Sequence, residues 1–250
     1  MQILLQLSLI YVIGATAGWI SEFFVRRAVH KKWINPGFLV GPNLPLYGTG
    51  TVLLYLLCRV DYSFISSAVL RNVFVVSVIT CAMTAIEYVT GLIFIKGMHV
   101  KLWDYSDRFG NVQGIICPLF TLAWGAAGTA YYFLLHKRLV VAAAWIASHP
   151  AFGYFLGVYS GVMLIDVFYS FRIVDKIRKW AKEKNVVVRY EELKENIKTR
   201  AAAFKQKHSF ILPFKSNRGL KSELDEYAGR GTRRPGNGVD TENPPQNNID

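Results

Sequence analysis

Residues 3–27, ILLQLSLIYVIGATAGWISEFFVRR, decide the class of this protein. The run is predominantly apolar, with Glu22 as its one charged residue before the two final arginines, and is long enough to cross a bilayer, which takes about 20 residues of helix. Residues 15–17, Ala-Thr-Ala, imitate a signal-peptide cleavage site, but no Lys or Arg precedes the run, and Arg26 and Arg27 follow it. This order of charge predicts an uncleaved transmembrane helix with its N-terminus outside.

Four further apolar segments follow along the chain, at about residues 44–58, 72–95, 112–135 and 150–171. The first of these is the shortest. We therefore predict an all-α fold, a polytopic membrane helix bundle of about five transmembrane helices over residues 1–171 with a cytoplasmic helical tail. The lipid bilayer is the first partner that this composition implies.

Lys and Arg flank these segments unequally. The side that follows the first and third segments carries seven of them, and the basic tail lies on the same side: Arg26, Arg27, Lys31, Lys32, Lys96, Lys101 and Arg108. The opposite side carries only Arg59, Arg71, Lys137 and Arg138. The positive-inside rule predicts a multi-pass protein of the bacterial cytoplasmic membrane, with its N-terminus outside and its C-terminal tail in the cytoplasm.

Composition excludes an ordinary soluble enzyme. Of the 250 residues, 52% are hydrophobic and 18% charged, and the mean hydropathy is +0.25. The net charge of +12 is concentrated in the tail, because residues 1–171 hold 11 Lys/Arg against 6 Asp/Glu and residues 172–250 hold 18 against 11. Anionic lipid explains such a tail, and no nucleic-acid recognition motif accompanies it, so we expect no nucleic-acid partner.

The tail divides into two parts. Residues 172–214 are expected to form an amphipathic cytoplasmic helix whose apolar stripe lies on the membrane surface or packs on a partner: Tyr190, Leu193, Ile197, Ala201 and Phe204. Residues 215–250 are rich in Gly, Pro, Asn and charge and are expected to be disordered.

Three carboxylates lie within the apolar segments. Glu22, Glu87 and Asp166 are four, nine and six residues from the next basic residue, which places them roughly 6, 13 and 9 Å inside the cytoplasmic boundary. Ionisable groups at such depth normally face the bundle interior and mark function. They could bind a cation, relay protons, hold a basic substrate group or act as a general acid, or each could simply be hydrogen-bonded to a neighbouring helix.

Polar and small residues gather on the same side. Residues 33–50 contain seven Gly or Pro and cannot form a plain helix. They either re-enter the membrane, with backbone N–H groups that form an anion-binding nest, or simply connect two helices. Asn111, Gly114 and Pro118 are expected to share a face of the fourth helix. Residues 103–106, Trp-Asp-Tyr-Ser, could close a site there.

Other patterns carry less chemistry. Gly14 with Gly18, and Gly153 with Gly157 and Gly161, have the spacing of close helix packing. The three cysteines and five histidines form no metal-binding pattern, and we expect no metal site and no disulfide. No Walker, GxSxG or HExxH motif occurs, so no cofactor is expected.

Five motifs in order, NPGFLVGP (35–42), PLYG (45–48), EYVTG (87–91), WDYS (103–106) and NVQG (111–114), resemble the ABC-transporter type IV family, also called CmpB-like. The resemblance covers roughly residues 10–170. Two positions depart from the family pattern, which has Arg where this chain has Pro36 and an acid where it has Ile95. A role that needs two acids on the third helix is therefore doubtful here.

The resemblance implies a permease-like subunit of a transporter. Because five spans are few for a complete path and no nucleotide-binding motif is present, ATP-driven transport would require a separate ATPase subunit and an oligomer, such as a homo-oligomer. The candidate substrate- or ion-binding residues are Glu22, Asn35, Tyr47, Glu87, Tyr88, Thr90, Trp103, Asp104, Tyr105, Asn111 and Asp166. Whether the protein is an enzyme stays open, because an enzyme acting on a lipid or lipid-linked substrate at the cytoplasmic leaflet would also place its polar residues on one side. A third hypothesis is a structural or regulatory protein whose tail binds the partner.

Overall fold

The computed structural model describes residues 2–31, 33, 35–203, 221–222, 224–226 and 239–241. The chain divides into two compact units, one formed by residues 1–90 and 105–168 and the other by residues 91–104 and 169–250. The protein is mostly helical, as expected. The described part is not entirely helical, because the second unit contains a small sheet.

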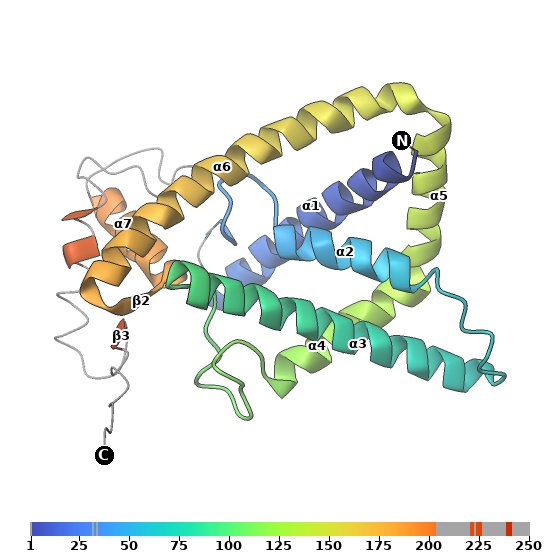
Figure 1. Cartoon of the computed structure of the whole chain (residues 1–250), viewed down its shortest axis with the longest axis horizontal. Coiled ribbons are helices and arrows are strands. Elements are labelled where there is room, and N and C mark those ends of the chain that lie inside the picture. Colours follow the sequence, from blue (N-terminus) through green and yellow to red (C-terminus); the bar gives the residue numbers. More distant parts are fainter. Residues whose placement is uncertain are drawn as a thin grey trace, which may run out of the picture. The chain divides into compact units, whose positions relative to one another are not determined.

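The described residues of the first unit form mainly α-helices, which Figure 1 labels. They are α1 (Gln2–His30), α2 (Pro45–Leu57), most of α3 (Ala68–Leu92), α4 (Pro118–Ala130), α5 (His136–Ser148) and the first part of α6 (Gly153–Lys184). A π-helical turn at Tyr131–Leu135 joins α4 to α5. The helices α1, α2 and α3 run in alternating directions in Figure 1, as successive crossings of one bilayer would.

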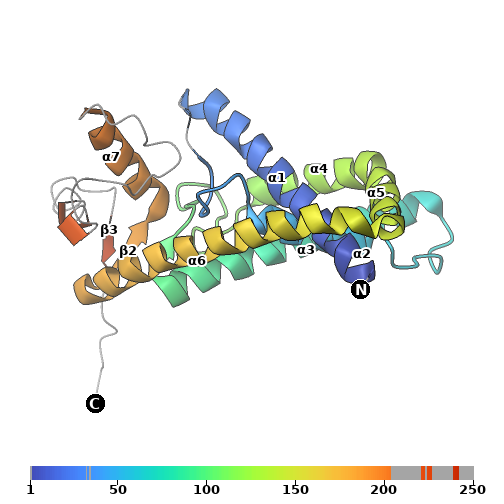
Figure 2. The same cartoon turned by 90° about the horizontal axis from the view of Figure 1, so that it is seen from above.

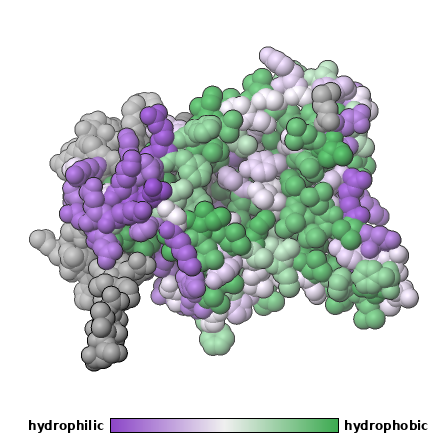
Figure 3. Space-filling view, viewed as in Figure 1, coloured by the Kyte–Doolittle hydropathy of each residue, from purple (hydrophilic) through white to green (hydrophobic). Residues whose placement is uncertain are grey.

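Three helices are long and apolar enough to cross a membrane, at Gln2–Ala28, Ala68–Gly97 and Pro150–Lys184. Little of their surface is buried, and none of the most apolar window of the last one is. Figure 3 accordingly shows apolar residues over much of the face formed by the first unit. A surface of this kind is typical of helices that face lipid.

The expected second and fourth crossings differ in length from the other three. The helix α2 has 13 residues, about 20 Å of helix. The fourth helix begins at Pro118 and not near residue 112, because Gln113 and Gly114 both have positive φ angles that a helix cannot contain. The expectation that Asn111, Gly114 and Pro118 share a helix face is therefore wrong.

Close packing of α1 on α2 explains two of the expected small residues. A Cβ atom at Gly14 would collide with Thr51, and one at Gly18 would collide with Tyr47. On α6, a Cβ at Gly153 would lie 3.0 Å from Leu5, whereas Gly157 and Gly161 face open space among the described residues. The packing interpretation is thus confirmed on α1 and wrong for two of the three glycines of α6.

The second unit holds the end of α6, the sheet and α7 (Tyr190–Ala203), as Figure 2 shows for its helices. Strand β1 (Val100–Lys101) pairs in parallel with β2 (Val186–Arg189), which pairs in antiparallel fashion with β3 (Val239–Thr241). Three successive valines favour the strand at residues 186–188, inside the segment expected to be helical. Strand β3 falls within the segment expected to be disordered; most of residues 215–250 lie outside the described part.

The apolar stripe of α7 is buried within the chain. Tyr190, Leu193 and Ile197 are each exposed by 3% or less. The side chains of Ala201 and Phe204 lie outside the described residues. The part of the stripe that is described therefore packs inside the second unit, where α6 contributes the buried Val174 and Ile177.

Candidate functional site

The segment before α2 folds back along α1. The backbone N–H of Leu44 donates to the carbonyl of Ala15, halfway along α1, at 3.0 Å. Phe38, Leu39 and Leu44 are buried. Gly37 supplies a positive φ angle that allows the turn. The backbone thus turns back to the middle of a candidate span and is covered by protein, and we call residues 35–44 the re-entrant segment for this path along α1.

Asn35 organises this segment. Its amide donates to the carbonyl of Val40 at 2.7 Å and to that of Leu39 at 3.3 Å, and its Oδ1 accepts from the indole N–H of Trp19 at 2.6 Å. The side chain is buried. The Asn35 side chain therefore holds the re-entrant segment against α1.

Asp166 of α6 occupies the backbone nest that the glycine pattern suggested. The N–H of Val40 donates to its Oδ1 at 3.0 Å and that of Gly41 to its Oδ2 at 2.7 Å. Any Cβ at residue 41 would lie 2.9 Å from Oδ2. The anion held by this nest is thus a carboxylate of the same chain.

A second polar link joins α6 to the same segment. The hydroxyl of Tyr159 donates to Asn43 Oδ1 at 2.8 Å and lies 2.9 Å from the hydroxyl of Thr16 on α1. Together with Asp166, this contact ties α1, the re-entrant segment and α6 at one level of the bundle.

Glu22 and Glu87 belong to a separate group. Glu22 forms an ion pair with Arg26 at 3.1 Å, and its other oxygen accepts from the hydroxyl of Tyr47 at 3.2 Å. Glu87 is only 3% exposed. It accepts from the hydroxyl of Tyr105 at 3.1 Å and from the indole N–H of Trp124 at 2.9 Å.

The two carboxylates are linked through aromatic rings. The rings of Tyr47 and Trp124 lie 5.4 Å apart between centroids. We call these five residues, Glu22, Tyr47, Glu87, Tyr105 and Trp124, the acidic cluster. They come from α1, α2, α3, the loop after β1, and α4, so the site requires nearly the whole first unit.

Tyr105 donates to Glu87 from the loop that precedes α4. Its ring is stacked on that of Phe120 at 4.2 Å, and burial raises the pKa of its hydroxyl, an effect that the charge of Glu87 increases. The hydroxyl therefore stays protonated and remains a hydrogen-bond donor at neutral pH.

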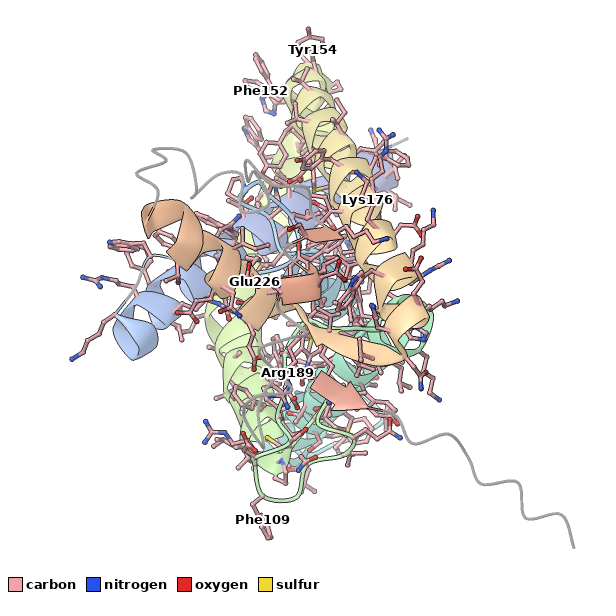
Figure 4. All side chains as sticks on the ribbon, turned by 90° about the vertical axis from the view of Figure 1, so that its left-hand side faces the viewer. Phe109, Phe152, Tyr154, Lys176, Arg189 and Glu226 are labelled. Atoms are coloured by element: carbon pink, nitrogen blue, oxygen red, sulfur yellow. The ribbon has the colours of Figure 1, made fainter. Side chains whose placement is uncertain are left out.

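Asn111 holds the loop that follows Tyr105. Its amide donates to the carbonyls of Ser106 and Arg108, and its Oδ1 accepts from the N–H of Gly114. Phe109, at the tip, is 95% exposed and points away from the helices (Figure 4). Asn111 thus shapes the loop and does not reach the acidic cluster.

Other expected site residues have different surroundings. Tyr88 and Thr90 form no side-chain hydrogen bond with the described residues. Trp103 and Asp104 belong to the second unit, where Asp104 is 3.1 Å from Arg189 and 3.5 Å from Lys101. Figure 4 places Arg189 at β2.

Trp124 was not predicted from the sequence. It is one aromatic residue in an apolar run, and neither charge nor spacing distinguishes it. Within the described ranges, no group of three or more His, Cys, Asp or Glu side chains is arranged to hold a metal ion. The cluster offers two carboxylates that can act on a cation or a proton.

The described part of the chain defines a mostly helical protein with three candidate membrane spans, and the acidic cluster lies among its helices. The chain belongs to the family described as "Putative ABC-transporter type IV", whose model matches residues 9–171. This range contains all of the acidic cluster and the re-entrant segment. Neither a curated protein nor a solved structure matches the chain.

Proposed function

We propose that the protein is the permease-like membrane subunit of a transporter and that the acidic cluster binds a cationic group of the substrate. The observation that carries the proposal is the environment of Glu87, which is buried and whose hydrogen-bond donors, Tyr105 and Trp124, are both neutral. A buried carboxylate is costly unless a positive charge or a proton balances it. A substrate ammonium would supply that charge.

The proposal includes an orientation. With five crossings and the N-terminus outside, the cluster faces the cytoplasmic half of the bilayer, because Arg26 and the other flanking basic residues define that side. The shorter helices α2 and α4 would then be the second and fourth crossings. Residues 105–117 would lie at the cytoplasmic mouth of the site.

A separate subunit supplies the energy in this proposal. The chain contains no nucleotide-binding motif, and five crossings are few for a complete pathway. We therefore propose an ATPase partner and association of several membrane subunits. Co-purification of an ATPase with the tagged full-length protein from native membranes supports this part, and its absence under mild solubilisation contradicts it.

The test of the cluster uses a strain that lacks the gene and carries either the wild type, Glu87→Gln, Glu22→Gln or Asp107→Asn. Asp107 is an exposed acid outside the cluster and serves as the matched control. We expect the two Glu variants, but not Asp107→Asn, to lose the cellular accumulation of a cationic metabolite that the wild type restores. Normal accumulation in Glu87→Gln would overturn the proposal.

A second candidate function is an enzyme that acts on a lipid at the cytoplasmic leaflet. The observation that favours it is the placement of Glu87 and the proton-bearing Tyr105 next to each other on one side of the bundle. Lipid profiles of the same strains distinguish the two. A lipid that accumulates in Glu87→Gln, with metabolite uptake unchanged, supports the enzyme.

A further inference from the structure

A cavity of about 430 Å³, shaped as a groove that is open to the outside of the bundle, lies between α1, α2 and the first part of α6. Helix α1 contributes Leu7, Ser8 and Tyr11, and α6 contributes Ser160, Met163 and Leu164. The volume falls within the range of about 300–1,000 Å³ that ligand pockets span. Tyr11 precedes Glu22 by about 16 Å of helix, so the cavity is distinct from the acidic cluster.

Three hydroxyl groups converge on this otherwise apolar cavity. Within the part of the chain that the structure describes, no hydrogen bond is formed by the hydroxyls of Ser8, Tyr11 and Ser160. Two candidate spans carry them. In hydrocarbon no water is present to satisfy such groups, so each unbonded hydroxyl is costly. An occupant that offers hydrogen-bond acceptors would remove that cost.

The depth of the hydroxyls narrows the choice of occupant. Ser8 and Tyr11 lie within about 15 Å of the start of α1. Gly153, near the start of α6, would carry a Cβ 3.0 Å from Leu5, so the two helices begin side by side. With Glu22 about 6 Å inside the cytoplasmic boundary and a hydrocarbon core of about 30 Å, Ser8 and Tyr11 lie in hydrocarbon within about 10 Å of the opposite boundary, within reach of the ester groups of glycerolipids.

We propose that this cavity binds one acyl chain of a membrane glycerolipid, whose ester carbonyls accept hydrogen bonds from Ser8, Tyr11 and Ser160. The apolar wall that Leu7, Met163 and Leu164 form suits the chain itself. The backbone of a second copy's helix would offer only carbonyls that already accept one hydrogen bond each within that helix. Ester carbonyls are free acceptors.

The test uses the full-length protein in liposomes that contain phosphatidylethanolamine with a photoactivatable diazirine in one acyl chain. After irradiation, we expect labelled peptides that contain residues 7–11 and 160–164. Met163→Trp fills the cavity and is expected to remove most of this label. Ile165→Trp is the matched control, because Ile165 is 70% exposed on the same helix and does not line the cavity.

Tyr11→Phe tests the hydrogen bonds without filling the cavity. At a limiting probe concentration its labelling should fall about threefold, the effect of one average hydrogen bond in a membrane protein. Equal labelling of Met163→Trp and the wild type would overturn the proposal, as would unchanged labelling of Tyr11→Phe. A wild-type protein that carries no label at these peptides would overturn it as well.

Discussion

At the scale of single residues, substitution of Asp166 should destabilise the re-entrant segment more than any other single change. Its carboxylate accepts from two backbone N–H groups, and hydrogen bonds to charged groups are worth about 1.5–3 kcal/mol each. We expect Asp166→Asn to lower stability by about 2 kcal/mol, because the amide nitrogen cannot accept one of the two bonds and the remaining oxygen is no longer charged. Thermal unfolding in detergent micelles measures the change.

The control is Asp175→Asn on the same helix. Asp175 is 43% exposed and pairs with Lys179 at 3.0 Å. Exposed ion pairs contribute at most about 1 kcal/mol, so this variant should unfold close to the wild type. If both variants lose the same stability, Asp166 has no special role.

His136 should make the free energy of unfolding depend on pH. Burial lowers the pKa of its imidazole below the ordinary 6.5, and the charge of Arg59 lowers it further. Between the lowered pKa of the folded protein and pH 6.5, the imidazole binds more protons in the unfolded chain than in the folded one. The contribution of His136 to the free energy of unfolding is therefore complete above pH 6.5 and is lost as the pH falls below it.

Melting temperatures between pH 8 and pH 5 check this expectation. The wild type should lose a few degrees below pH 6.5, and His136→Gln should lose less. His136 faces Tyr131, whose hydroxyl is 3.4 Å from Nδ1. A pH profile that is identical in the two proteins would assign the dependence to other groups.

The acids of the site were predictable from the apolar segments around them, and Tyr47 and Tyr105 from the motifs PLYG and WDYS. Glu22 and Glu87 were found because a carboxylate in an apolar segment is rare and costly. The bond partner of Asp166 could not be predicted, because Gly41 is 125 residues away in sequence. Trp124 was not predicted as a site residue, because a Trp in an apolar run cannot be told from an ordinary packing residue.

At the scale of helices and loops, the pair α1 and α2 depends on a glycine. A Cβ at Gly18 would overlap the Tyr47 Cβ, which is too close to the backbone to move easily. We expect Gly18→Ala to cost about 1–3 kcal/mol and to displace Tyr47 from Glu22. Thermal unfolding measures the cost, and the substrate accumulation assay measures the displacement.

Gly161→Ala on α6 is the control for this change. Nothing lies within 4 Å of a Cβ at Gly161 among the described residues. The variant should be neutral or slightly more stable, since Ala is the better helix former by up to about 1 kcal/mol. Equal losses in the two variants would show that helix packing is not the cause.

The helices were easier to predict than their ends. Apolar length indicated each of them, but the start of the fourth helix depends on the positive φ angles of Gln113 and Gly114, which a hydropathy pattern does not contain. Strand β2 was missed for a related reason. Its two strand partners lie far away in sequence, at residues 100–101 and 239–241.

At the scale of the whole molecule, the distribution of charge predicts the side on which each loop lies. Asp107 and Lys137 are both exposed and lie on either side of α4. We expect a membrane-impermeant maleimide to label Lys137→Cys in intact spheroplasts and Asp107→Cys only in inverted vesicles. The parent protein, with its three native cysteines, gives the background.

The same experiment tests whether α4 crosses the bilayer. Labelling of both cysteines from the same side would mean that α4 does not cross the bilayer, and the five-helix arrangement would fail. That this is a helical protein with candidate membrane spans was predictable, because the prediction depends on the total apolar length and the total charge on each side. Small errors in helix boundaries change these totals little.

The bond between Asp166 and the re-entrant segment also sets an order of assembly. Residues 40 and 41 leave the ribosome long before residue 166. Their N–H groups can therefore bond to the Asp166 carboxylate only after all intervening helices have been synthesised. A nascent chain that stops before α6 would leave the two N–H groups without that partner. Completion of this pair of hydrogen bonds is thus a late step in biogenesis, by which a finished chain differs from a truncated one.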